Sequence, residues 1–295
     1  MPQTEAKQTA TEAPANIERL VAKMGELQMI PTIALKALEM SEDPGVSISE
    51  LQATVTLDQA LTAQILRMAN SSIYGLRREI ATVSHAVAIL GLDTTRFILS
   101  AACVQQVFQT GKNQPWAFGR KLLADHSWGA ALCARTIAQK ISYAVEEEAF
   151  LAALMHDIGK AVLLKNENER YRAVANDVYH GEITFHEAEQ VVFGFSHAQV
   201  GSILASRWNF PPQLAEAIGC HHDPESAQRF KQLAQITALA NKTMSLMGIG
   251  FEKAPDMILH QQPEAQSLAL DAAALQEIVE ATRTSIDQMS ETIAY

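Results

Sequence analysis

Cysteine is scarce in this chain of 295 residues. The three cysteines, Cys103, Cys133 and Cys220, stand far apart, and their number is odd. They form neither a CxxC metal or redox motif nor the paired pattern of a disulfide framework. Reduced thiols in a cytoplasmic protein are therefore the simplest interpretation.

Basic charge is also in short supply. The chain has 23 Lys and Arg against 33 Asp and Glu, which gives a formal net charge of −10, and no basic run stands out. Binding to nucleic acid requires clustered Lys and Arg that neutralise phosphates. Residues 48–66 and 85–99 have a helix–turn–helix rhythm, but helical hairpins are common and these faces carry few basic residues. We therefore do not expect nucleic acid as a partner.

Long apolar runs are missing as well. None reaches the roughly 18–20 residues that span a bilayer, and the first twenty residues lack the apolar core of a signal peptide. We expect a cytoplasmic protein without a membrane partner. Gly and Pro are sparse, at 14 and 10, and aromatics make up 6%. Good helix formers dominate instead, and no strand-like alternation persists, so we expect an all-α fold.

The helical pattern has recognisable starts and boundaries. Ser47 and Glu50 match a capping box, and Asp58 is a good N-cap. The segment GKNQPW, residues 111–116, is the best internal boundary. We expect a disordered lead over 1–16, an N-terminal helical lobe over 17–115, a second helical lobe over 116–247, and a C-terminal loop and helix over 248–295. From the boundary onward, helices are expected over 117–141, 145–164, 197–208, 211–220, 227–247 and 271–294.

Histidine and aspartate gather in the second half of the chain. They occur in ADHSWGAA, LAALMHDIGKAVLLK, GFSHAQVG and IGCHHDP, each on or at the end of an expected helix. Neutral imidazole and carboxylate are the usual ligands of Zn, Fe and Mn, and carboxylates also suit Mg. Ligands from several helices can converge on a bundle core. The candidate ligands are His126, His156, Asp157, His197, His221 and His222.

Each of these residues also has an ordinary interpretation. A single histidine on an apolar face is more often a hydrogen-bonded core residue than a metal ligand. The HHDP segment could be a helix C-terminus whose imidazoles interact favourably with the helix dipole. Only the joint pattern favours a metal site, and the spacing along the chain does not prove that the residues converge.

The combined motifs resemble a known family. LMHDIGK, with His126 thirty residues before it and HAQVGSILASRWNFPPQLAEAIGCHH after it, resembles the HD superfamily of metal-dependent phosphohydrolases. IPTIALKALEM, LDQALTAQILRMANSSIYG and VSHAVAILGL are similar to the signature of its HDOD branch. The resemblance covers roughly Met24 to Met247. It implies a multi-helix bundle with an N-terminal HDOD lobe and an HD-like lobe after it.

The resemblance also implies an arrangement of ligands around one or two divalent ions, with Fe, Mn, Zn or Mg as candidates. It implies a first metal position at His126, His156 and Asp157. A second position would use Asp157 again, with His197, His221 and the nearby His222. In this pattern Asp157 bridges or orients the reacting groups, which makes it the main catalytic candidate.

Two further positions qualify this assignment. The superfamily completes the first metal position with a later aspartate, and the matching residue here is Asn241, an uncharged and weaker ligand. Lys160, in HDIGK, matches a place where related hydrolases put a cation near phosphate. It could equally be a solvated lysine one turn beyond the motif.

Two functions stay open at this point. HDOD proteins resemble regulatory modules of bacterial signalling, which implies a protein that binds a ligand or a signalling partner and keeps a residual metal site. The exposed-looking turn with Arg77 and Arg78 is a candidate contact for such a partner. The alternative is a metal-dependent phosphohydrolase acting on a nucleotide or cyclic nucleotide. No GYP segment follows HHDP, which argues against a cyclic di-GMP phosphodiesterase.

Overall fold

The expected all-α class is confirmed by the computed structural model. It describes Ile17 and residues 32–292 except 44, 72, 73, 77, 109–116 and 182, and the described residues form no strand. Both the expected lead, 1–16, and the boundary segment, 111–116, lie outside the described residues. None of the described helices is both long and apolar enough to cross a membrane.

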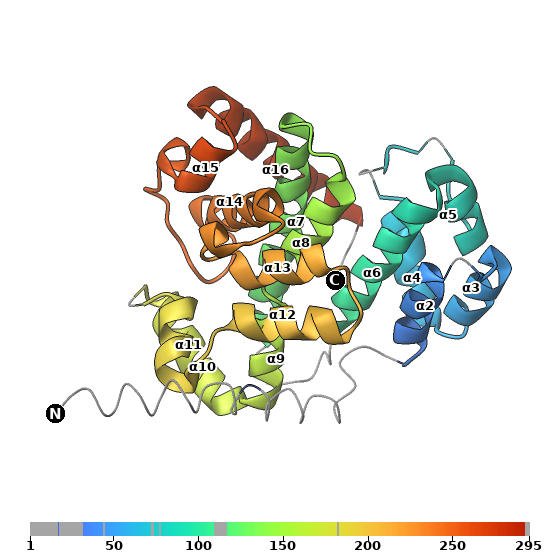
Figure 1. The fold of residues 1–295 in the computed structure, drawn as a ribbon, viewed down its shortest axis with the longest axis horizontal. Helices are drawn as coiled ribbons and strands as arrows, with labels where there is room; N and C mark the ends of the chain where they lie inside the picture. Colours follow the sequence, from blue (N-terminus) through green and yellow to red (C-terminus); the bar gives the residue numbers. More distant parts are fainter. Residues whose placement is uncertain are drawn as a thin grey trace.

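The first group of helices lies on one side of the molecule (Figure 1). It consists of α2 (Thr32–Glu42), α3 (Ile48–Val55), α4 (Gln59–Ala69), α5 (Val83–Leu90) and α6 (Leu92–Phe108). The long helix α6 contacts α2, α4 and α5 and also reaches α7, α8 and α9 of the second group. It therefore joins the two groups, which we call the N-terminal lobe and the second lobe.

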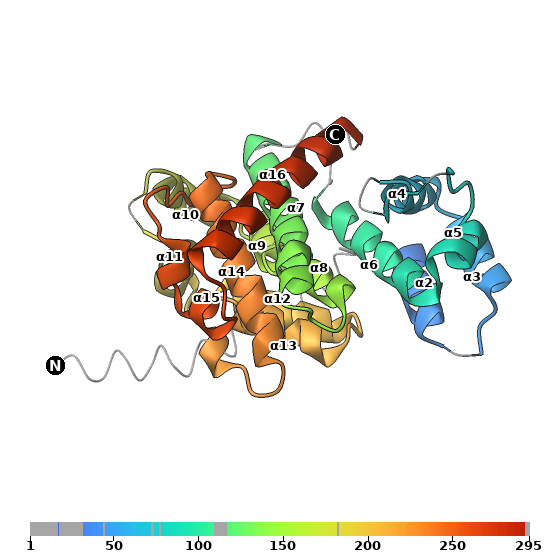
Figure 2. The ribbon, with the colours of Figure 1, turned by 90° about the horizontal axis from the view of Figure 1, so that it is seen from above.

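The second lobe is built around α7, which contacts α8, α14 and α16. Figure 2 shows α16 running along α7 on the outside of this lobe. The helices of the second lobe are α7 (Ala117–Lys140), α8 (Glu146–Met155), α9 (Ile158–Asn166), α10 (Asn168–Tyr179), α11 (Phe185–Phe193), α12 (His197–Arg207), α13 (Pro212–Cys220), η2 (Pro224–Ser226), α14 (Lys231–Met247), η3 (Leu259–Gln261), α15 (Pro263–Ser267) and α16 (Ala272–Thr292).

Local signals at the helix starts are confirmed. The Ser47 hydroxyl accepts a hydrogen bond from the Glu50 backbone N–H, and the Glu50 carboxylate accepts one from the Ser47 N–H. Asp58 caps α4 by accepting from the Leu61 N–H at 3.0 Å. Both devices satisfy backbone donors that have no partner within the helix. Of the arginines in the expected contact turn, Arg78 is exposed and Arg77 lies outside the described residues.

The expected single helix over 145–164 is wrong. The chain forms α8 and α9 with a turn at His156 and Asp157 between them. The His156 Nδ1 donates to the Ala153 carbonyl at 2.6 Å, which occupies an acceptor of the last turn of α8. His156 and Asp157 therefore lie in a turn between two helices, and both side chains are buried.

Helices α10, α11 and α15 were not expected from the sequence. The first two matter for the site, because α11 lies directly before the segment that carries His197. Thr184 and Glu187 form a second capping box at the start of α11, and Gly194 ends the helix in a left-handed conformation. These local signals could have revealed the helix.

Candidate functional site

Six of the predicted residues meet in the interior of the second lobe. Asp157 comes from the α8–α9 turn, His126 from α7, and His197 from the first residue of α12. His221 and His222 follow the end of α13, and His156 precedes Asp157. Their ligand atoms form two clusters, each with all atoms within 4.8 Å of one another. The first cluster is His126, His156 and Asp157, and the second is His197, His221 and His222.

Asp157 lies between the two clusters. Its Oδ1 is 3.4 Å from His156 Nε2, 3.3 Å from His197 Nε2 and 4.0 Å from His221 Nε2. Its Oδ2 lies 3.7 Å from His126 Nε2 and accepts from the Lys160 ammonium at 2.9 Å. Asp157 is 1% exposed. One carboxylate therefore faces every imidazole of the site except His222.

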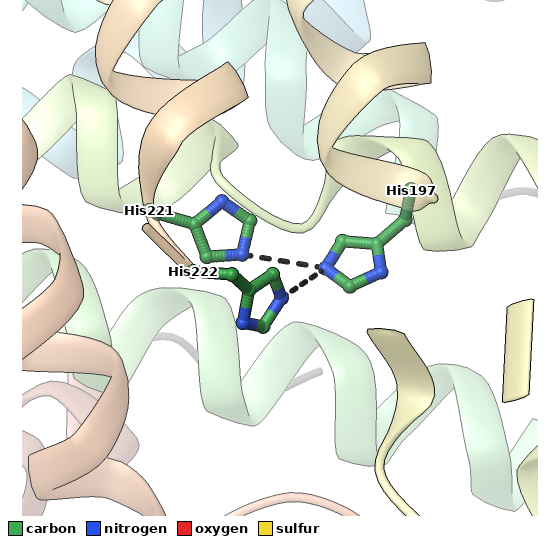
Figure 3. Close-up of side chains that lie close together, drawn as sticks. All are labelled: His197, His221 and His222. Carbon is green, nitrogen blue, oxygen red and sulfur yellow. Dashed lines mark hydrogen bonds between the residues drawn. The ribbon is translucent and has the colours of Figure 1, made fainter. Parts of the chain in front are cut away.

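The second cluster is shown in Figure 3. His197 Nε2 lies 3.3 Å from His221 Nε2 and 2.9 Å from His222 Nε2. His197 and His221 are buried, whereas His222 is half-buried at the edge of the cluster. The three Nε2 atoms thus point toward one common region next to Asp157 Oδ1.

Backbone hydrogen bonds determine which nitrogens carry protons. The Nδ1 atoms of His126, His156 and His221 lie 2.9, 2.6 and 2.7 Å from the carbonyls of Ile249, Ala153 and Ile218. A carbonyl can only accept, so each Nδ1 must donate. Each neutral ring then presents an unprotonated Nε2 to the site. This is the tautomer that a metal ligand requires.

Burial keeps most of these rings neutral. It lowers the pKa of His156 to about 4 and holds the pKa values of His221 and His222 well below the ordinary range. Burial also opposes the charge of Asp157, but His156 and the Lys160 ammonium outweigh it and keep the pKa of this carboxyl well below its usual value. The site therefore combines the neutral imidazoles of His156, His221 and His222 with an ionised carboxylate.

Several electron pairs converge without a proton between them. Among the described residues, His156 Nε2 and Asp157 Oδ1 are buried and have no hydrogen-bond partner. Unpaired buried polar atoms are costly. Two ligands of a tetrahedral ion, each about 2.1 Å from it, lie about 3.4 Å apart. The 3.3 and 3.4 Å separations around Asp157 Oδ1 agree with that value, so the donor set fits a divalent cation.

Asn241 lies beside His126 of the first cluster. Its Oδ1 is 3.0 Å from His126 Nε2, and it comes from the buried face of α14. Because His126 Nδ1 donates to Ile249, both atoms of this contact offer electron pairs unless a cation or a turned amide intervenes. Asn241 thus adds a neutral oxygen to the first cluster in place of a charged one.

Lys160 is inside the site, which excludes the solvated interpretation. It is 2% exposed, its ammonium pairs with Asp157, and it lies 4.3 Å from the centre of the Phe185 ring. Burial disfavours its charge, but Asp157 and nearby Glu252 and Glu189 prevail and raise the pKa of Lys160. The lysine is therefore charged and neutralises part of the negative charge of the site.

Glu189 on α11 is a residue of the site that sequence reasoning missed. It is fully buried, and its Oε2 accepts from both His197 Nδ1 and the His197 backbone N–H at 2.6 Å. Its Oε1 accepts from the Tyr171 hydroxyl at 2.8 Å. Phe185, Ala188 and Glu189 share one buried helix face. This helical spacing in the sequence could have indicated that Glu189 is buried. The carboxylate fixes His197 with Nε2 turned toward Asp157, and it raises the pKa of this imidazole against the effect of burial.

We expect Glu189→Gln to weaken metal binding by about 10–100-fold, the usual effect of removing a carboxylate that orients a ligating histidine. The amide oxygen can still accept from His197, but the amide NH2 then faces the Tyr171 hydroxyl, and the charge that orients the imidazole is lost. Competition with a chromophoric chelator measures the affinity. Glu169→Gln, an exposed change on neighbouring α10, is the control. Equal affinity of Glu189→Gln and wild type would contradict the positioning role.

Two glycines allow these close approaches. A Cβ on Gly159 would lie 2.1 Å from the His197 carbonyl oxygen, and one on Gly250 would lie 2.7 Å from His126 Nδ1. Gly250 also has a φ of +110°, which residues with side chains rarely adopt. The absent side chains let α9 pack against the start of α12 and let the Ile249 carbonyl reach His126.

Comparison with known proteins identifies the family of this chain. The family model described as "HDOD domain" matches residues 27–224. The chain belongs to the HDOD domain family. The match includes His126, His156, Asp157, His197 and both histidines of the HHDP segment. The resemblance inferred from the sequence motifs is thus confirmed.

Solved structures share this fold. An HDOD domain protein of unknown function from Geobacter sulfurreducens is 28% identical, with a TM-score of 0.75 over 94% of this chain and 99% of that one. A protein of Shewanella amazonensis SB2B, called a candidate phosphohydrolase, is 21% identical, with a TM-score of 0.72 over 92% and 97%. A candidate signal transduction protein from Marinobacter aquaeolei VT8 is 20% identical, with a TM-score of 0.66 over 90% and 59%.

A curated relative covers nearly the same region. An uncharacterised protein of Treponema pallidum (strain Nichols) is 26% identical over an alignment of 288 residues, which covers 92% of this chain and 55% of that protein. The chain thus spans about half the length of the curated relative it matches.

Proposed function

We propose that this HDOD protein is a signal-transduction module that acts by binding a partner, with a divalent metal held at the histidine–aspartate site as part of its structure. One observation carries this choice over catalysis. In the described part of the chain, the cavity beside His126, Asp157 and Lys160 has a volume of only about 10 Å³. That is room for about one water molecule, far less than a phosphate ester needs.

Four further residues line this cavity, and three of them contact one another. Phe185, Phe251 and Glu252 line it, and the Glu252 carboxylate accepts from the Phe185 backbone N–H at 2.9 Å. The Phe185 and Phe251 rings pack edge to face at 5.5 Å. A hydrogen bond and an aromatic pair thus connect three residues that line this small cavity, which supports binding over catalysis.

A metal at this site is supported by its charge as well as by its geometry. Asp157 and Glu189 are fully buried carboxylates, and Lys160 is the buried ammonium that faces them. The excess negative charge and the unprotonated imidazoles favour a cation. Mainly nitrogen ligands suit Fe, Mn or Zn better than Mg, which prefers oxygen. One ion would use the first cluster, a second ion the second cluster, and Asp157 faces both.

A metal-dependent phosphohydrolase is the second candidate, and the position of Asp157 between two clusters favours it. A bound divalent metal supplies an activated water at neutral pH. On this hypothesis Asp157 orients the reacting groups and Lys160 holds substrate phosphate. Opening would require Phe185, Phe251 and Glu252 to move and Lys160 to leave Asp157. A nucleotide or cyclic nucleotide would be the substrate.

The deciding experiment combines metal content with turnover. We expect elemental analysis of the purified protein to find one or two Fe, Mn or Zn per chain, and less in His156→Ala. We expect wild type and His156→Ala to hydrolyse p-nitrophenyl phosphate, bis-p-nitrophenyl phosphate and cyclic di-GMP equally slowly with added Mn, Mg, Fe or Zn. A robust wild-type rate that His156→Ala abolishes would establish the hydrolase instead.

A further inference from the structure

A second cavity lies away from the histidine site, between the N-terminal lobe and the second lobe. Its volume is about 730 Å³, within the range of ligand-binding clefts. Residues of α2 and α6 form one wall, and α8 with the loop between α12 and α13 forms the other. We call this cavity the inter-lobe groove. Neither the metal hypothesis nor the family assignment gives it a role.

Aromatic side chains line the groove. Phe97 comes from α6, and Trp208 and Phe210 come from the loop before α13. The Trp208 and Phe210 rings pack at 65° with their centres 6.4 Å apart. Asn209 between them has a φ of +56°, and the Phe210 N–H donates to the Ala205 carbonyl at 3.0 Å. The loop is therefore fixed, and it presents a preformed aromatic surface.

The charged groups of the groove are mostly acidic. Glu39, Asp93 and Glu148 line it together with Arg96, which pairs with Asp93 at 3.1 Å. Three carboxylates against one guanidinium leave a net charge of −2. Glu148 is half-buried and accepts from Gln213 Nε2 at 2.8 Å, so its carboxylate is held beside the aromatic loop.

The aromatic rings and the carboxylates together indicate which kind of ligand the groove would bind. Aromatic faces attract cations, and a guanidinium stacks on them more readily than an ammonium does. A carboxylate beside the rings can pair with a guanidinium in a two-pronged geometry. The remaining apolar wall, which includes Leu38 and Leu151, would cover neighbouring apolar side chains. A phosphate-bearing ligand would instead meet three carboxylates.

We propose that the inter-lobe groove binds an arginine-bearing apolar segment of a partner protein, with the guanidinium between Glu148 and the ring of Trp208. The proposal rests on the binding function proposed above, since it supplies that function with a docking site. Because the walls belong to different lobes, the bound segment contacts both lobes at once. The proposed binding of this segment does not depend on whether the histidine site holds metal.

Fluorine NMR of the full-length protein labelled with fluorotryptophan tests the proposal. The chain has three tryptophans, and Trp208→Phe assigns the reporter. The probe is a capped hexapeptide, Leu-Arg-Leu-Leu-Arg-Leu, and its counterpart carries Glu in place of Arg. We expect the arginine peptide to shift the Trp208 signal saturably and the glutamate peptide to leave it unmoved. A Trp208 signal unmoved by the arginine peptide would overturn the proposal.

Charge variants separate specific docking from attraction to an acidic protein. We expect Glu148→Gln to weaken peptide binding about tenfold or more, and Glu39→Gln, an exposed change on α2, to weaken it less. Glu280→Gln, an exposed change on α16, removes the same charge elsewhere and should leave the affinity unchanged. Equal weakening by Glu148→Gln and Glu280→Gln would overturn the docking site. Metal content should be the same in all these variants, so failure here leaves the metal hypothesis standing.

Discussion

Asp157→Ala is expected to lower the free energy of unfolding by about 3–5 kcal/mol, the usual cost of leaving one member of a buried ion pair without its partner. In wild type the Lys160 ammonium is 2.9 Å from Asp157 Oδ2, and both side chains are buried. The variant keeps the lysine in the interior and removes the carboxylate that compensates it. Urea unfolding with and without a chelator measures the change.

The same variant is expected to lose metal from both clusters, because Asp157 Oδ1 lies 3.4 Å from His156 Nε2 and 3.3 Å from His197 Nε2. Elemental analysis should find little or no metal in this variant. A variant that kept half of the wild-type metal would show that Asp157 serves one cluster only. That result would contradict the shared position inferred from these distances.

The double variant Asp157→Ala with Lys160→Met distinguishes the two effects. Removing both charges of a buried pair is often close to neutral for stability, whereas removing one charge is not. We expect the double variant to recover most of the lost unfolding free energy and none of the lost metal. Recovery of metal along with stability would mean that unfolding, rather than a missing ligand, had emptied the site.

Features that depend on neighbouring residues could be predicted from the sequence. The caps at Ser47 and Asp58 are local, since the side chain bonds a backbone N–H three residues later. The histidines stood out because polar groups are conspicuous on apolar helix faces. The motif combination also identified the HDOD family, because it tests many positions at once.

Features that depend on packing were not predictable in the same way. The pattern of apolar residues continues through His156 and Asp157, so one helix was expected where the chain forms α8 and α9. The break is stabilised by the bond from His156 to Ala153 and by the contact of Gly159 with α12. The role of Glu189 depends on how α11 packs, because its partner His197 belongs to another helix. The small cavity beside Asp157 likewise involves Phe251 and Glu252, which lie far along the chain.

Gly159→Ala is the second change with a large expected effect. The added Cβ would lie 2.1 Å from the His197 carbonyl oxygen and 2.8 Å from its carbonyl carbon. Both are backbone atoms at the first residue of α12, so no side-chain rotation can relieve the overlap. We expect α9 and α12 to separate and the free energy of unfolding to fall by at least about 3 kcal/mol. Urea unfolding of the chelator-treated protein isolates this effect from metal binding.

Gly219→Ala is the matched control, because Gly219 also lies within a helix, α13. Its added Cβ would meet Ser202 Oγ at 3.1 Å and Ser202 Cβ at 3.2 Å, so a small shift relieves the contact, unlike the overlap at Gly159. There the better helix propensity of alanine, about 1 kcal/mol, offsets the tighter contact. Equal unfolding free energies for the two variants would contradict the close packing at Gly159.

The metal content of Gly159→Ala gives a second and independent readout. Moving α12 away from α9 carries His197 away from Asp157, whose Oδ1 is 3.3 Å from His197 Nε2. His126 and His156 lie on α7 and at the end of α8, so the first cluster does not depend on the position of α12. We therefore expect a partial loss of metal in Gly159→Ala, in contrast to the complete loss in Asp157→Ala. Complete loss in both variants would instead indicate that the two clusters bind metal only together.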